Sequence, residues 1–263
     1  MAETSPALTY SSYLALDEIL GAQRPRSDEH DELLFIVIHQ VYELWFKQLL
    51  HELAYLQMRL ERNEGPRALA TVRRVVTILK TIVAQIDVLE TMTPSQFTSF
   101  RTRLDSASGF QSGQFRELEA VLGRRDPAML AAYDSGSNAY RRIAAAMQRR
   151  SVFDSFVRYL AGAGFDVPAE ALERDVREPL RPSAGVQRAV LEAYRADGEA
   201  AQLAERLVDL DEGTQEWRYR HVKMVERTIG DKSGTGGSSG ASYLRETLLR
   251  PVFPDLWSVR SQL

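Results

Sequence analysis

Residues 33–60, LLFIVIHQVYELWFKQLLHELAYLQMRL, carry the pattern that decides the fold. Their apolar side chains recur at helical spacing, and neither glycine nor proline interrupts the run. This spacing lays one apolar stripe along a helix and therefore predicts a long amphipathic helix that packs in a core. The residues expected near its buried face are Leu34, Ile38, Val41, Trp45, Leu49 and Leu53.

Two further stretches predict long helices. Residues 67–89 repeat the helical spacing of apolar side chains. Residues 200–229 predict a second helix as long as the first. In residues 67–89 the apolar positions are Val72, Val76, Ile78, Leu79, Ile82 and Ile86.

Shorter helices are expected between these stretches. Thr93 followed by Pro94 is typical of an N-cap with proline at the first helical position, which predicts a short helix through Arg101 to Leu104. A loop and a helix are expected over residues 106–122. Residues 126–197 predict smaller helices around Tyr133, at 153–160 and at 186–194. Because no alternating strand pattern and no repeat is found, we predict an all-α bundle. It would be one domain over residues 1–263, with 126–197 as a shorter-helix excursion.

Composition excludes several classes of protein. The 263 residues are 44% hydrophobic, enough to bury a sizeable core, and the net charge of −3 gives no electrostatic case for nucleic acid as a partner. No apolar run approaches the roughly 20 residues of a membrane span, and residues 1–5 lack the features of a signal peptide. We therefore expect a cytoplasmic protein without a membrane partner.

The chain contains no cysteine. This excludes disulfides, cysteine-ligated zinc or iron–sulfur clusters, and haem held by a thiolate or attached covalently through cysteine. Any haem would be held non-covalently by histidine, methionine or tyrosine.

A histidine near a helix end precedes a segment rich in glycine and serine, in WRYRHVKMVERTIGDKSGTGGSSG at residues 217–240. A helical histidine such as His221 is more often a satisfied core residue than a ligand, and a glycine–serine run is usually a linker. Only 23 residues follow Gly240, too few for a second domain, so we expect the chain to return to the same core. Glycine would let the backbone approach a ligand closely, but the spacing of a phosphate-binding loop is absent.

Two pairs of side chains lie four residues apart and therefore share helix faces: Phe35 with His39, and Phe97 with Arg101. Arginine suits the two-pronged binding of a carboxylate, and residues 106–112, SASGFQS, favour a tight turn beside it. The alternatives are a hydrogen-bonded core histidine and a solvated arginine. From spacing alone, the sequence predicts a helical protein with a possible small-molecule pocket.

In order and spacing, these segments together resemble the tryptophan 2,3-dioxygenase family over almost the full length. The matching segments are LTYSSYL at 8–14, FIVIHQ at 35–40 with ELW at 43–45, Arg101 followed by SGFQS at 108–112, and residues 217–240. The resemblance implies a buried b-type haem, active as Fe²⁺, with His221 as the axial ligand of the iron. It also implies L-tryptophan and O2 as substrates.

The resemblance also implies roles for residues of the substrate pocket. His39 would face the indole NH as the catalytic residue, with Phe35 packed on the indole. Phe97 and Val41-Tyr42 depart from some bacterial members, which carry tyrosine and Thr-Ser there. Arg101 would bind the substrate carboxylate, Thr235 would lie beside the ammonium and carboxylate, Phe97 would lie near the carboxylate, and Ser108 and Gly109 would line the pocket near the haem.

The N-terminal segment, residues 1–20, has two interpretations. It is either an ordinary amphipathic helix that packs on its own core or, as the resemblance implies, a segment that reaches a neighbouring subunit's pocket in a homotetramer. In the second case Tyr10, Tyr13 and Leu14 would contact substrate.

The function implied is haem-dependent insertion of O2 across the indole C2–C3 bond of L-tryptophan to give N-formyl-L-kynurenine, the first step of tryptophan degradation by the kynurenine pathway. One alternative is a haem monooxygenase acting on tryptophan or a methylated tryptophan in secondary metabolism. The other is a haem- or amino-acid-binding protein without turnover.

Overall fold

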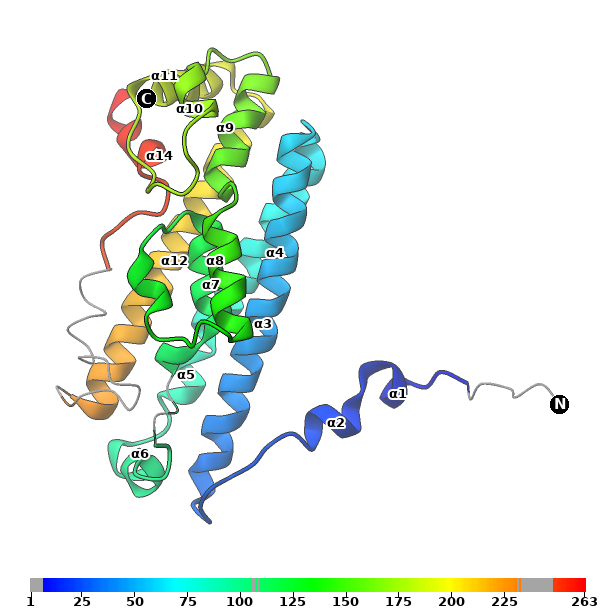
Figure 1. Ribbon diagram of the computed structural model, residues 1–263, viewed down its shortest axis with the longest axis vertical. Helices are drawn as coiled ribbons and strands as arrows, with labels where there is room; N and C mark the ends of the chain where they lie inside the picture. The colour runs from blue at the N-terminus through cyan, green and yellow to red at the C-terminus, as the bar shows by residue number, and fades with distance from the viewer. Residues whose placement is uncertain (1–6, 106, 108, 231, 233–247) are drawn as a thin grey trace.

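The computed structural model describes residues 7–105, 107, 109–230, 232 and 248–263. Within these residues the chain is all-α, as predicted, and no strand occurs. Three long helices form the bundle: α3 (His30–Glu61), α4 (Gly65–Ala84) and α12 (Glu199–Ile229), with α4 packed against both of the others (Figure 1).

Helix α3 extends the predicted helix by a few residues, but its buried stripe is rotated. Ile38, Leu49 and Leu53 are buried as expected, whereas Val41 and Trp45 are only half-buried. Tyr42 and Phe46 take their places in the core. The reason is that α3 is covered from more than one side, by α4, α7 and α9, so one sequence stripe does not define its buried face.

The helix predicted over residues 67–89 is divided. It ends at Ala84, and a short α5 (Ile86–Leu89) follows after Gln85. Helix α12 begins one residue before its predicted start and ends where predicted. There Gly230 adopts a φ of +61° and its N–H bonds Glu226 O, a helix ending that favours glycine.

Helix α6 (Pro94–Arg101) begins as predicted. The Thr93 side chain accepts from Gln96 N, and the Gln96 side chain accepts from Thr93 N, so the two form a capping box. The helix ends at Arg101, earlier than the predicted Leu104. It is followed by the 3₁₀ helix η1 (Gly109–Gln111) and by α7 (Gly113–Leu122).

The middle of the chain contributes to the main core. Tyr133 lies in a turn, so the helix predicted around it is wrong; Ser137 caps a helix that starts afterwards. Phe156, Leu160 and Val190 belong to the main core cluster. The division of the chain into domains stays a prediction. The elements of this region are η2 (Pro127–Leu130), α8 (Asn138–Met147), α9 (Val152–Gly162), α10 (Ala169–Leu172) and α11 (Ala184–Ala196).

The C-terminal segment returns to the same core, as expected. The carboxylate of Asp211 on α12 is fully buried and accepts from Val252 N at 2.8 Å, Phe253 N at 2.8 Å and Trp257 Nε1 at 2.9 Å. Phe253 stacks on Phe153. Asp211 thus holds the C-terminal segment against α12. This segment contains the last two helices, α14 (Pro254–Ser258) and η3 (Arg260–Gln262).

The N-terminal segment projects away from the bundle (Figure 1). Its helices α1 (Tyr10–Leu14) and α2 (Leu16–Leu20) contain no buried residue. Packing of this segment on its own core is therefore wrong, because no part of the bundle covers it. Gln23 Nε2, which bonds Gln40 Oε1 at 2.7 Å, ties the base of the segment to α3.

Helix α3 is also long and apolar enough to cross a membrane by length and composition, although its sequence predicts no membrane span. It is the one such helix among the described residues, and a single one is weak grounds for a span. The cytoplasmic location and the absence of membrane and nucleic-acid partners stay predictions.

Candidate functional site

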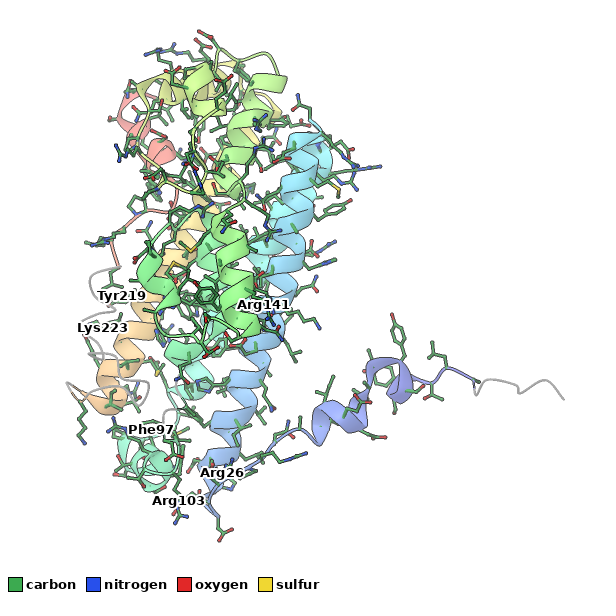
Figure 2. All side chains as sticks on the ribbon, in the orientation of Figure 1. Arg26, Phe97, Arg103, Arg141, Tyr219 and Lys223 are labelled. Atoms are coloured by element: carbon green, nitrogen blue, oxygen red, sulfur yellow. The ribbon has the colours of Figure 1, made fainter. Side chains whose placement is uncertain are left out.

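The predicted aromatic residues of α3 and α6 meet at one end of the bundle. The Phe35 ring lies 5.7 Å from the Phe97 ring and 5.7 Å from the Phe100 ring, between centroids. Phe35 also packs on His39, at 4.2 Å. Figure 2 shows Phe97 below the C-terminal half of α12, where Tyr219 and Lys223 are labelled. The structure therefore brings the two predicted pairs of residues to the same end of the molecule.

The protonation of His39 follows from the one hydrogen bond that its ring makes to a described residue. Its Nδ1 lies 2.6 Å from the carbonyl oxygen of Phe35. Because a carbonyl can only accept, Nδ1 carries the proton and Nε2 keeps its lone pair. Burial lowers the pKa of His39, against the opposing effects of this bond and of the Glu43 charge. His39 is thus a neutral hydrogen-bond acceptor at neutral pH.

The backbone of η1 lies beside this acceptor. A Cβ placed on Gly109 would lie 3.9 Å from His39 Nε2, and apart from its chain neighbours no other atom of the described residues would be within 4 Å. Glycine therefore leaves room next to the free lone pair for another group. The place predicted for Gly109, in the pocket near the haem, stays a prediction, and Ser108 lies outside the described residues.

His221 approaches from α12. Its ring stacks on Trp217, with centroids 4.9 Å apart and planes 11° apart, and Trp217 packs on Phe115 at 4.6 Å. Burial lowers the pKa of His221 to about 4, and the charge of Arg116 acts in the same direction. His221 is therefore neutral at neutral pH.

The His221 ring makes no hydrogen bond to any residue that the structure describes. A neutral imidazole with an uncommitted nitrogen is the donor that haem iron takes as an axial ligand. The nearby acceptor His39 and the phenylalanines of α3 and α6 suit a flat aromatic ligand with an N–H group. These residues thus fit both a haem and an aromatic substrate.

The remaining predicted site residues are placed in part. Arg101 is half-buried in the last turn of α6, which packs against both α3 and α12. Thr235 lies outside the described residues. Tyr10 and Tyr13 are exposed on the projecting segment, and Leu14 is half-buried there, so this chain does not bring them to its own site.

Two residues of the site were not identified from the sequence. Trp217 precedes His221 by four residues, the same spacing that identified the pairs of α3 and α6, so that rule applied to α12 would have found it. Tyr42 lies 6.4 Å from His39 between ring centroids. The Trp217 Nε1 and Tyr42 hydroxyl groups are buried without a hydrogen-bond partner in the described part of the chain. The four-residue spacing does not predict that these two buried polar groups lack a hydrogen-bond partner.

Known proteins resemble this chain over nearly its whole length. A family model described as tryptophan 2,3-dioxygenase matches residues 1–143 and 144–263. A tryptophan 2,3-dioxygenase of Anaeromyxobacter sp. (strain K) is 69% identical over 259 residues, 98% of this chain and 97% of the relative. Those of Herpetosiphon aurantiacus and Ralstonia pickettii are 58% and 44% identical, over 98% of this chain and 100% and 94% of the relatives. The similarity spans every element that contributes to the site.

Proposed function

The chain belongs to the tryptophan 2,3-dioxygenase family, and on that premise we propose that it adds both atoms of O2 across the indole C2–C3 bond of L-tryptophan. The product is N-formyl-L-kynurenine. The observation that best supports this function is the pair of neutral imidazoles set among aromatic rings, His39 beside Phe35 on α3 and His221 stacked on Trp217 of α12.

The cofactor in this proposal is a b-type haem in its Fe²⁺ form. His221 would hold the iron, and with no cysteine in the chain the haem would be bound non-covalently. Bound haem supplies the dioxygen chemistry, while the protein orients the substrate and excludes water. Gly109 and Ser108 would line the pocket beside the haem.

The substrate would be held at both of its ends. Nε2 of His39 would accept the hydrogen bond of the indole N–H and orient the ring, and Phe35 would pack on that ring. Arg101 would bind the carboxylate in two parallel bonds, with Thr235 next to the ammonium group. Phe97 would supply apolar surface near the carboxylate without a hydroxyl.

The product formed under labelled dioxygen tests this function. When the ferrous, haem-loaded protein meets L-tryptophan under ¹⁸O2, mass spectrometry should find two labelled atoms in the product. One labelled atom would instead support the monooxygenase alternative. Haem absorption without any turnover would support a binding protein.

Substitution His39→Ala should leave haem binding intact and reduce turnover only in part, because His39 orients the indole and does not hold the iron. The acid limb of the wild-type rate profile should lie below the ordinary imidazole pKa of about 6.5, since burial lowers the pKa of His39 and keeps it neutral to lower pH. Steady-state rates between pH 5 and 8, about the range of imidazole titration, measure the fall in turnover and the position of the acid limb. Soret absorbance measures haem binding. Complete loss of haem in this variant would contradict the assignment.

Deletion of residues 1–20 should leave the bundle folded, because α1 and α2 bury nothing in it. In the proposed homotetramer, however, Tyr10, Tyr13 and Leu14 contact the substrate of a neighbouring subunit, so turnover of bound tryptophan should fall. Circular dichroism checks the fold, light scattering the oligomer, and steady-state kinetics the site. Unchanged turnover would argue against a shared site.

A further inference from the structure

A cavity lies between α3, α4, α7 and α12, and its lining includes the segment around Arg250. Its volume is about 600 Å³, within the range of pockets that hold small organic ligands. Neither His39 nor His221 lines it, and neither does Arg101. The cavity is therefore separate from the proposed substrate site.

The inner wall of this cavity is apolar. Phe46 and Leu49 come from α3, Ile82 from α4, Leu118 from α7 and Trp217 from α12. Aromatic and branched side chains from four helices create a surface suited to a flat hydrocarbon ring, which would gain free energy by leaving water.

The rest of the cavity lining contains several arginines. Its carboxylates are already paired: Glu119 with Arg124 at 2.9 Å and with Arg116 at 2.6 Å, and Asp126 with Arg124 at 3.0 Å. Among the described lining residues, guanidinium groups outnumber carboxylates by two. The guanidinium groups belong to Arg124, Arg125, Arg218 and Arg250, and the carboxylates to Glu119 and Asp126.

Arg125 is the most deeply buried of these cations. Its guanidinium donates to the carbonyl oxygens of Val176 at 2.7 Å, Ala120 at 2.5 Å and Arg149 at 2.7 Å. Among the described residues no carboxylate lies within ion-pairing distance of it, and burial lowers its pKa. The charge of Asp154 and these carbonyl dipoles only partly balance the buried guanidinium, whose positive charge adds to the field in the cavity.

Arg250 is an exposed residue of the cavity lining. Its carbonyl oxygen accepts from Arg218 Nη1 at 2.9 Å, which holds the backbone, while the residue itself is exposed. A side chain fixed at its base and open to solvent can fold over a bound carboxylate. It can then make the charge-assisted bonds that guanidinium groups favour.

We propose that this cavity is a second binding site, for an aromatic monocarboxylate. The ring would lie against Phe46 and Trp217, and the carboxylate would face Arg250 within the field of Arg125. Trp217 also stacks on His221, which is proposed to hold the haem iron. A ligand that contacts Trp217 in the cavity should therefore alter the environment of His221.

Calorimetric titration of 2-naphthoate into the haem-loaded protein tests the proposal. Oxygen is excluded and L-tryptophan fills the proposed substrate site, while its ammonium group disfavours its binding beside the arginines of the cavity. One further equivalent should bind, and its dissociation constant should rise at least tenfold in Arg250→Glu. The matched control is Arg188→Glu, an exposed arginine on α11 that does not line the cavity, which should bind like the wild type.

Two further measurements locate the site. Leu122→Trp, which fills the cavity from α7, should abolish binding, and binding to the wild type should shift the Soret band through Trp217. Absence of saturable binding, or equal affinity in the wild type and Arg250→Glu, would overturn the proposal. So would binding with no change in the Soret band, since it would place naphthoate elsewhere. If the haem assignment alone is wrong, the protein will purify without a Soret band, a failure that is seen before any titration.

Discussion

The variant His221→Ala is expected to lose most of its haem and most of its tryptophan turnover. Burial keeps the His221 imidazole neutral, and no described residue bonds its ring, so its nitrogen is available to the iron. Removing the proposed axial ligand should destabilise haem binding itself. The ratio of Soret to protein absorbance in the purified protein measures haem content, and steady-state kinetics measure turnover.

A second histidine serves as the control that separates loss of the haem ligand from general destabilisation of the fold. His51 is exposed on α3, and His51→Ala should retain both haem and activity. Imidazole added to His221→Ala should restore part of the haem absorbance, because the side chain removed leaves space of that shape. Wild-type activity in His221→Ala would end the assignment of the axial ligand.

The sequence predicts the helices of this fold better than it predicts their buried faces. Helix α12 was predicted to within a residue at each end, because Gly230 ends a long periodic stretch and can adopt a positive φ. The stripe of α3 was rotated, with Tyr42 and Phe46 buried in place of Val41 and Trp45. Periodicity reports only that a helix has an apolar side, whereas the number of neighbours that cover it is a tertiary property.

The same limit applies to the candidate site. Four-residue spacing placed Phe35 beside His39 on one helix, which a ring distance of 4.2 Å confirms. It could not show that Phe97, from another helix, would lie against Phe35, or that Gly109 would face the free nitrogen of His39. Those contacts depend on how α3, α6 and η1 meet, and local spacing contains no information on that. The family resemblance supplied the roles, which stay predictions.

Substitution Arg101→Ala should lower kcat/KM for L-tryptophan by at least about ten- to a hundredfold. A hydrogen bond to a charged group contributes roughly 1.5–3 kcal/mol, and each 1.4 kcal/mol of lost transition-state binding is about a tenfold change in rate. Arg101→Lys should recover only part of the loss, since lysine keeps the charge but not the planar fork. Initial rates over a range of tryptophan concentrations separate kcat from KM.

A substrate without a carboxylate shows whether the fall in kcat/KM of Arg101→Ala comes from the lost carboxylate contact. Tryptamine has the indole and the ammonium group but no carboxylate, so wild type and Arg101→Ala should act on it with equal, low efficiency. Arg103, two residues further on and exposed, is the control for loss of a nearby positive charge, and Arg103→Ala should behave like the wild type. If Arg101→Ala slows tryptamine and tryptophan to the same extent, Arg101 acts on the shape of α6 and not on the substrate carboxylate. Because α6 packs on both α3 and α12, such a result would also appear as altered haem absorbance, whereas loss of the carboxylate contact alone would leave the haem unchanged.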